Sequence, residues 1–104
     1  MSARMKKHKK DLCFLGRCNK VQRNNFLNVA PSTLIQAISD SAKTLLEGDL
    51  PISNYYRKKL RKDIGALKKL ARKSESITKK RSFLKTQQGG SLLSTIWKVI
   101  SNLF

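Results

Sequence analysis

The fold is decided by residues 32–73, which read STLIQAISDSAKTLLEGDLPISNYYRKKLRKDIGALKKLARK. The first half of this stretch repeats apolar residues at the spacing of one helix face. That face would contain Leu34, Ile35, Ile38, Ala42, Leu45 and Leu46. Ser32 follows Pro31 and suits an N-cap, and Gly48 suits the position just beyond a helix C-terminus. We therefore predict a helix that begins at Ser32 and ends before Gly48.

The second half predicts another helix, with two contrasting faces. After a turn over residues 49–52, Ser53 caps a helix that runs roughly from Asn54 to Lys73. Its apolar face would contain Tyr56, Leu60, Ile64, Leu67, Leu70 and Ala71. The opposite face is almost entirely lysine and arginine, so this helix should be buried on one side and strongly positive on the other.

The segments on either side add shorter helices and no strand pattern. Residues 12–16 and 21–27 predict two helical pieces. The residues of this region that would face a core are Val21, Phe26, Leu27 and Val29. Ser76 caps a third helix that extends to about Lys85. In that helix we expect Ile77, Phe83 and Leu84 to point inward and Lys79, Lys80 and Arg81 to point outward.

The resulting fold class is all-α, a small helical bundle with two appendages. Residues 1–10 have no apolar periodicity and are expected to form a disordered basic arm. Residues 11–86 form the bundle. Residues 87–90, which read QQGG, break the chain as a hinge, and residues 91–104 form an amphipathic apolar C-terminal helix. At 104 residues the chain holds one domain at most.

Positive charge is concentrated in one segment. The chain has 23 lysines and arginines against 6 acidic residues, a formal net charge of +17. Residues 57–85 hold 13 of the basic and 2 of the acidic residues, a net charge of +11. A compact body with such a field repels itself unless a polyanion neutralises it. Nucleic acid is the first candidate partner, and an anionic membrane surface is the second.

We predict that this segment binds DNA through the backbone phosphates. Its lysines and arginines belong to no recognisable base-reading motif, which favours sequence-independent binding. The predicted contacts are Arg57, Lys58, Lys59, Arg61, Lys62, Lys68, Lys69, Arg72, Lys73, Lys79, Lys80 and Arg81. The basic arm would add Lys6, Lys7, Lys9 and Lys10.

No constellation predicts catalysis, a cofactor or a metal. The six acidic residues are scattered, and no glycine-rich phosphate loop or nucleophile elbow is present. Cys13 and Cys18 with the single histidine, His8, are too few for a four-ligand zinc site. We expect Cys13 to be a small buried apolar residue. The chain therefore predicts a non-enzymatic protein with no metal and no cofactor.

The C-terminal helix leaves three alternatives open. Residues 91–104 are too few to cross a bilayer as a helix. The helix could belong to the core, could pack against a partner, or could lie in a membrane interface through Leu92, Ile96, Trp97, Ile100 and Phe104. The last case would make the protein membrane-active, and the partner-helix case would make it a structural capsid-associated protein.

The order of these segments resembles a family of small basic proteins of polinton-like and adinto-like DNA viruses and their integrated relatives. The resemblance covers about residues 10–104. It rests on LIQAISDSAKTLLEGDLPIS (34–53), on the basic helix that follows, and on KKRSFLKTQQGG (79–90) with its apolar tail. That family is usually compared with the minor core proteins of adenoviruses.

The resemblance implies a viral core protein that neutralises and condenses packaged DNA, in the virion and in the host nucleus. It also implies capsid proteins and a viral cysteine protease as partners. Gln88, Gly89, Gly90 and Ser91 are similar to the sites that adenovirus-type proteases cut, with the break after Gly90. A flexible hinge explains the two glycines equally well.

Overall fold

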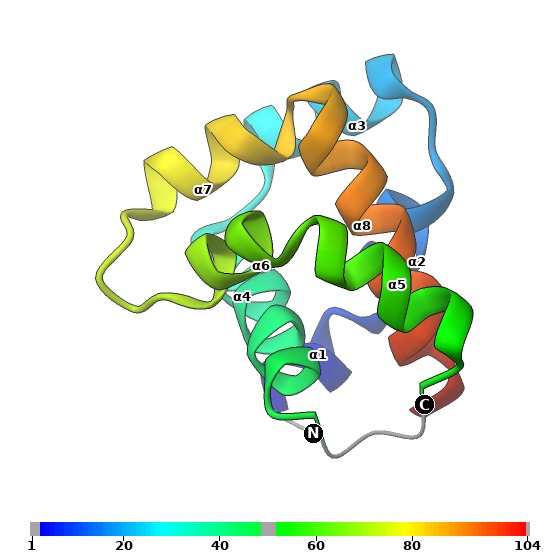
Figure 1. Cartoon of the computed structure of the whole chain (residues 1–104). Coiled ribbons are helices and arrows are strands. Elements are labelled where there is room, and N and C mark those ends of the chain that lie inside the picture. Colours follow the sequence, from blue (N-terminus) through cyan, green and yellow to red (C-terminus); the bar gives the residue numbers. More distant parts are fainter. Residues whose placement is uncertain (1–2, 49–51, 104) are drawn as a thin grey trace.

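The computed structural model of the protein describes residues 3–48 and 52–103, and all regular structure in these ranges is helical (Figure 1). Its elements are α1 (Ala3–Lys7), α2 (Lys9–Arg17), α3 (Lys20–Val29), α4 (Ser32–Leu46), α5 (Asn54–Lys62), α6 (Ile64–Ala71), α7 (Ile77–Leu84), α8 (Gln87–Ile100) and a 3-10 turn over Ser101–Leu103. The prediction of an all-α fold is confirmed.

Two helices form the centre of the molecule. α4 packs against α1, α6, α7 and α8, and α8 packs in addition against α2, α3 and α5. Each contributes fully buried branched side chains, Ile35 and Ile38 from α4 and Ile96 and Ile100 from α8. Three roles were left open for the C-terminal helix: part of the core, a partner helix, or a membrane-interface helix. In the structure α8 is part of the core.

α4 closely follows its sequence prediction. All of the predicted stripe is buried apart from Leu46, which packs partly exposed against the core. The prediction of Ser32 as the N-cap is wrong by one residue, because Ser32 is already the first residue of the helix and the N-cap is Pro31, which forms no side-chain cap hydrogen bond. Gly48 follows the helix with a φ of +74°, a left-handed conformation that glycine adopts without strain. The predicted C-terminal signal is therefore confirmed.

The predicted long basic helix is two helices with a break at Asp63. The amide of Asp63 bonds to the carbonyl of Leu60 at 3.2 Å, three residues back, so the α-helical ladder is interrupted there. Leu60, Leu67 and Leu70 remain buried on both sides of the break. Ile64 directly follows the break and is exposed, which the uninterrupted pattern did not predict.

The basic arm is helical from Ala3 onward, so the prediction of disorder is wrong for residues 3–10. Met5 is fully buried in the core, and His8 is buried between Asp11 and Thr33. A single methionine among lysines produces no periodic signal, which is why the sequence did not reveal this helix. The four lysines of the arm are exposed.

The prediction of a hinge at residues 87–90 is also wrong, because these residues form the first turn of α8. The hydroxyl of Thr86 caps the helix by accepting the amide of Gly89 at 3.0 Å. A Cβ atom at Gly89 would overlap the backbone carbonyl of Phe83, and one at Gly90 would overlap the guanidinium of Arg23. The two glycines therefore permit close packing of α8 against α7 and α3.

α3 is rotated relative to its prediction. Val21 and Val29 are exposed, Val29 by 82%, whereas Phe26 is half-buried and Leu27 is fully buried. The side chain that shares the buried face with Leu27 is Arg23, one helical turn earlier. α3 therefore places a cation against the core where the pattern indicated valine.

Candidate nucleic-acid interface

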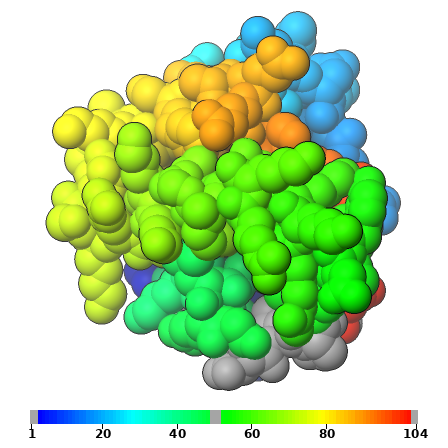
Figure 2. Space-filling model, in the orientation of Figure 1, coloured from blue at the N-terminus to red at the C-terminus, as the bar shows by residue number. Residues whose placement is uncertain are grey.

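Basic side chains line one face of the molecule along α5, α6 and the start of the following loop. Figure 2 shows that this part of the chain covers much of the visible surface. Exposed on it are Arg57, Lys58, Arg61, Lys62, Lys68, Lys69, Arg72 and Lys73. We call these eight residues the basic face. The structure thus brings together most of the predicted DNA contacts of this segment.

The basic face is held in place by the apolar side of the same helices. Leu60, Leu67 and Leu70 are buried beneath it, so the charged side chains must point away from the core. Ser53 caps α5 by accepting the amide of Tyr56. Arg57 also donates to the carbonyl of Ile52 at 3.1 Å, which ties the start of α5 to the preceding residues.

No carboxylate of the described residues forms an ion pair with the basic face. Asp63 is the only acidic residue between Arg57 and Lys73. The face also places like charges four residues apart on a helix, as in Arg57 with Arg61 and Lys58 with Lys62. Such pairs repel by a few tenths of a kcal/mol each. The face is therefore under electrostatic strain that a bound polyanion would relieve.

Lys59 lies at the edge of the basic face and is half-buried. Its ammonium nitrogen lies 4.7 Å from the ring centre of Tyr55. The neighbouring ammonium lowers the pKa of the Tyr55 hydroxyl, and the hydroxyl in turn raises the pKa of Lys59. Lys59 therefore keeps its positive charge next to the basic face.

Two predicted DNA contacts point inward instead. Lys80 is 5% exposed, and its ammonium donates to the hydroxyl of Ser39 at 3.0 Å. Burial lowers the pKa of Lys80. Arg81 donates to the carbonyls of Leu27 and Ala30 at the end of α3. The prediction that Lys80 and Arg81 point outward is wrong, because α7 packs against both α3 and α4.

Lys79 is exposed on the outer side of α7. Its ammonium nitrogen lies 3.9 Å from a carboxylate oxygen of Glu75. An exposed pair at this distance contributes little to stability. Lys79 therefore extends the basic face only weakly, since its charge is partly balanced by Glu75.

The lysines of the N-terminal arm form a separate patch. Lys6 and Lys7 are on α1, and Lys9 and Lys10 are on α2. In Figure 1 these two helices lie behind α4 and α8, whereas α5 and α6 lie in front. Arg4 of the arm and Lys73 of the basic face line the same hollow, but none of the four lysines of the arm does.

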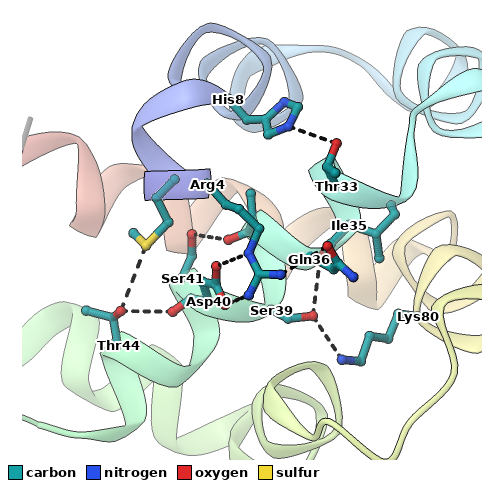
Figure 3. A network of polar contacts seen from close by, with 12 residues as sticks. Arg4, His8, Thr33, Ile35, Gln36, Ser39, Asp40, Ser41, Thr44 and Lys80 are labelled. Atoms are coloured by element: carbon teal, nitrogen blue, oxygen red, sulfur yellow. Dashed lines mark hydrogen bonds and ion pairs between the residues drawn. The ribbon is translucent and has the colours of Figure 1, made fainter. Parts of the chain in front are cut away.

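A polar network fixes α1 to α4 (Figure 3). The guanidinium of Arg4 binds both carboxylate oxygens of Asp40, at 2.9 and 3.1 Å, and donates to Gln36 at 3.0 Å. These residues line a surface hollow of about 820 Å³ that also contains Lys80 and Glu75. Within this hollow Arg4 pairs with Asp40 and Lys80 bonds to Ser39, and both contacts hold α1 and α7 against α4.

The remaining predicted site residues lie in α8. Leu92, Ile96, Trp97 and Ile100 are buried in the core, and Phe104 lies outside the described residues. Gln88, Gly89, Gly90 and Ser91 belong to the first turn of the helix, and both glycines are buried. Proteases prefer exposed loop tips. A cut after Gly90 would therefore require this turn to unfold first.

Sequence reasoning missed one residue of functional interest, Arg23. Its side chain is buried against the first turn of α8 and forms no hydrogen bond in the described part of the chain. The available signal was its position four residues before Leu27, on the same helix face. A charged residue at a core position is uncommon unless it has a partner.

Three further findings bound the function. No helix of the described residues is long and apolar enough to cross a membrane. The same residues contain no cluster of three or more histidine, cysteine or acidic side chains that could hold a metal ion. Comparison of the chain with protein-family models, curated proteins and solved structures finds no match.

Proposed function

We propose that the protein is a non-enzymatic, sequence-independent DNA-binding protein that neutralises and condenses DNA. The observation that carries this proposal is the basic face. Six exposed cations lie on two consecutive helices and two more, Arg72 and Lys73, directly follow them, and no carboxylate of the described residues pairs with any of the eight. Neutralising phosphates with these side chains would release the counterions that surround DNA, which favours binding.

The dimensions of the basic face suit a DNA backbone. α5 and α6 contain 9 and 8 residues, so end to end they extend over about 25 Å at about 1.5 Å per residue. Duplex DNA carries one negative charge for about every 1.7 Å of its axis. A duplex lying along the two helices would therefore present more phosphates than the face has cations.

The chemistry of the face favours phosphate contacts over base reading. Specific readers use asparagine, glutamine or arginine to form paired hydrogen bonds with base edges. Between Arg57 and Lys73 the chain has no asparagine and no glutamine. Lysine predominates there, and its ammonium acts on phosphate as a point charge. We therefore propose equal binding to unrelated sequences.

The resemblance to small basic proteins of polinton-like and adinto-like viruses supports a setting for this activity. We propose packaged viral DNA as the natural partner, in the virion and the host nucleus. The structure speaks against the membrane-active alternative, because four of the apolar side chains that would insert, Leu92, Ile96, Trp97 and Ile100, are buried in the core. Insertion would require α8 to leave the bundle.

The test compares two variants with equal net charge. One changes Arg61, Lys62, Lys69 and Arg72 of the basic face to glutamine. The control changes Lys6, Lys7, Lys9 and Lys10 of the arm to glutamine, so each variant loses four positive charges. Affinity for random duplexes is measured against salt, where the slope reports about 0.9 per phosphate neutralised.

We expect the variant of the basic face to bind all duplexes more weakly, with a salt slope shallower by about 3–4. The arm variant should keep most of the original slope. Equal losses in both variants would mean that only net charge matters and would reject the basic face as the interface. A preference of about a thousandfold for one duplex would reject sequence-independent binding.

A further inference from the structure

Arg23 is a buried cation without a counter-charge. Its side chain is 8% exposed, and its Nε is completely enclosed and makes no hydrogen bond. None of the ion pairs of the described residues includes it. Burying a charge without a partner is strongly unfavourable, so a protein rarely retains one without a compensating group. The position therefore indicates a partner that is not part of the described chain.

Arg23 lines a surface hollow of about 500 Å³ between α2, α3 and α8. The polar residues around it are cations, hydroxyls, an amide and a thiol. They are Arg17, Cys18, Lys20, Arg23, Gln87, Ser91 and Ser94. No aspartate or glutamate of the described residues lines the hollow. Asp63, which lies near the same turn of α8, lines a neighbouring hollow together with Gln87 and Ser91.

The first turn of α8 adds to the positive potential. α8 has 14 residues and begins at Gln87, and both Gln87 and Gly90 line the hollow. The N-terminus of a helix carries a partial positive charge and unpaired amides, which favour anions. Gly90 has no side chain at the point where a Cβ atom would overlap the guanidinium of Arg23. The cation is therefore packed directly on the helix start.

We propose that this hollow binds a phosphate group. The two terminal nitrogens of a guanidinium, Nη1 and Nη2, offer paired hydrogen bonds that match the geometry of phosphate oxygens, and the enclosed Nε of Arg23 takes no part in them. The hydroxyls of Ser91 and Ser94 and the amide of Gln87 supply neutral donors beside it. The phosphate can belong to a free phosphate compound or to a DNA backbone, since both present the same oxygens. The inference does not depend on the basic face, which lies on other helices.

The experiment measures inorganic phosphate binding to the full chain at constant ionic strength, by calorimetry and by the rise in melting temperature. A ligand that binds only the folded state raises that temperature, because it stabilises the fold by RT ln(1 + [L]/Kd). Arg23→Gln is compared with Lys98→Gln, which removes the same charge from an exposed position outside both the hollow and the basic face. We expect at least a tenfold loss of phosphate affinity in Arg23→Gln and no loss in Lys98→Gln.

A second variant keeps the inference testable if Arg23→Gln does not fold. Lys20→Gln with Ser94→Ala alters two residues at the rim of the hollow, where Lys20 is exposed and Ser94 is half-buried. It should also weaken phosphate binding about tenfold, as expected for loss of hydrogen bonds to a charged group. Unchanged phosphate affinity in this variant or in Arg23→Gln would overturn the site, as would an absence of phosphate binding by the original chain.

The source of the phosphate is resolved by competition. If the hollow takes a backbone phosphate, saturating phosphate should weaken binding to a short DNA duplex at fixed ionic strength, and Arg23→Gln should abolish that competition. If it takes a free phosphate compound, DNA affinity should not change. Either result supports the phosphate site. If the basic-face variant loses DNA binding but still binds phosphate, the phosphate site is independent of the basic face.

Discussion

At the scale of single residues, the glycines of this chain have opposite environments. Gly89 is buried, and its Cα faces the backbone carbonyl of Phe83 at the end of α7. Gly65 in α6 is exposed, and a Cβ atom there would have no neighbour within 4 Å. Glycine is therefore required by close packing at position 89. At position 65 it only adds to the conformational entropy that the chain loses on folding.

This contrast predicts opposite signs for two matched substitutions. Gly65→Ala should raise the free energy of unfolding by up to about 1 kcal/mol, because alanine favours a helix. Gly89→Ala should lower it by about 1–3 kcal/mol, because backbone must move to admit the methyl group. Urea unfolding followed by circular dichroism measures both. A stabilised Gly89→Ala would show that residues 87–90 are a hinge after all.

At the scale of elements, apolar stripes and capping residues within a few positions of one another predicted most of the helices. Contacts between helices that are distant in the sequence decide which charged side chains are buried, and the sequence alone does not show these contacts. The apolar stripe of α4 and the capping serines Ser53 and Ser76 needed only neighbours within a few residues. The inward positions of Arg23 and Lys80 depend on helices distant in the sequence. Much of the basic face could be predicted, because its residues lie opposite the apolar residues of the same two helices. Its role in DNA binding stays a prediction.

The position of α8 in the core predicts that the chain cannot fold without it. A chain that ends at Gly90 would lose Leu92, Ile96 and Ile100, which are all buried. Each such side chain contributes about 1.5–3 kcal/mol on burial, so the total loss is comparable to the whole stability of a small domain, about 5–15 kcal/mol. We expect the truncated chain to lose its helical circular dichroism.

A suitable control is Lys98→Gln, which changes the only charged residue of the same segment at an exposed position. This variant should unfold at nearly the same temperature as the original chain. If the truncated chain instead kept its helix content and its cooperative melting, α8 would be an appendage, and cleavage after Gly90 could occur without unfolding.

At the scale of the whole molecule, a high charge is confined to a small volume. The radius of gyration is 12.3 Å, close to the value of about 13 Å for an ordinary domain of 100 residues. The protein therefore carries its net charge of +17 in the volume of an ordinary domain of the same length. The self-repulsion that results is screened over about 10 Å at 0.1 M salt.

Salt should consequently affect the free and the DNA-bound protein in opposite directions. Raising sodium chloride from about 20 to about 300 mM should raise the melting temperature of the free protein, because screening weakens self-repulsion. The extra stability that a random DNA duplex provides should fall over the same range, because counterion release becomes less favourable. Thermal scans with and without the duplex measure both trends. A free protein that melts earlier in salt would contradict the account of self-repulsion.

The packing of α2 against α8 has a consequence for how the chain acquires its structure. Gly16 lies directly against Trp97. A ribosome adds about 5–20 residues per second, so the roughly 80 residues between them take about 4–16 s to synthesise. During that interval the apolar side of α2 has no α8 to cover it. Folding of this bundle can therefore be completed only after α8 has been synthesised, and the fluorescence of the Trp97 indole, which packs on Gly16, can report that step.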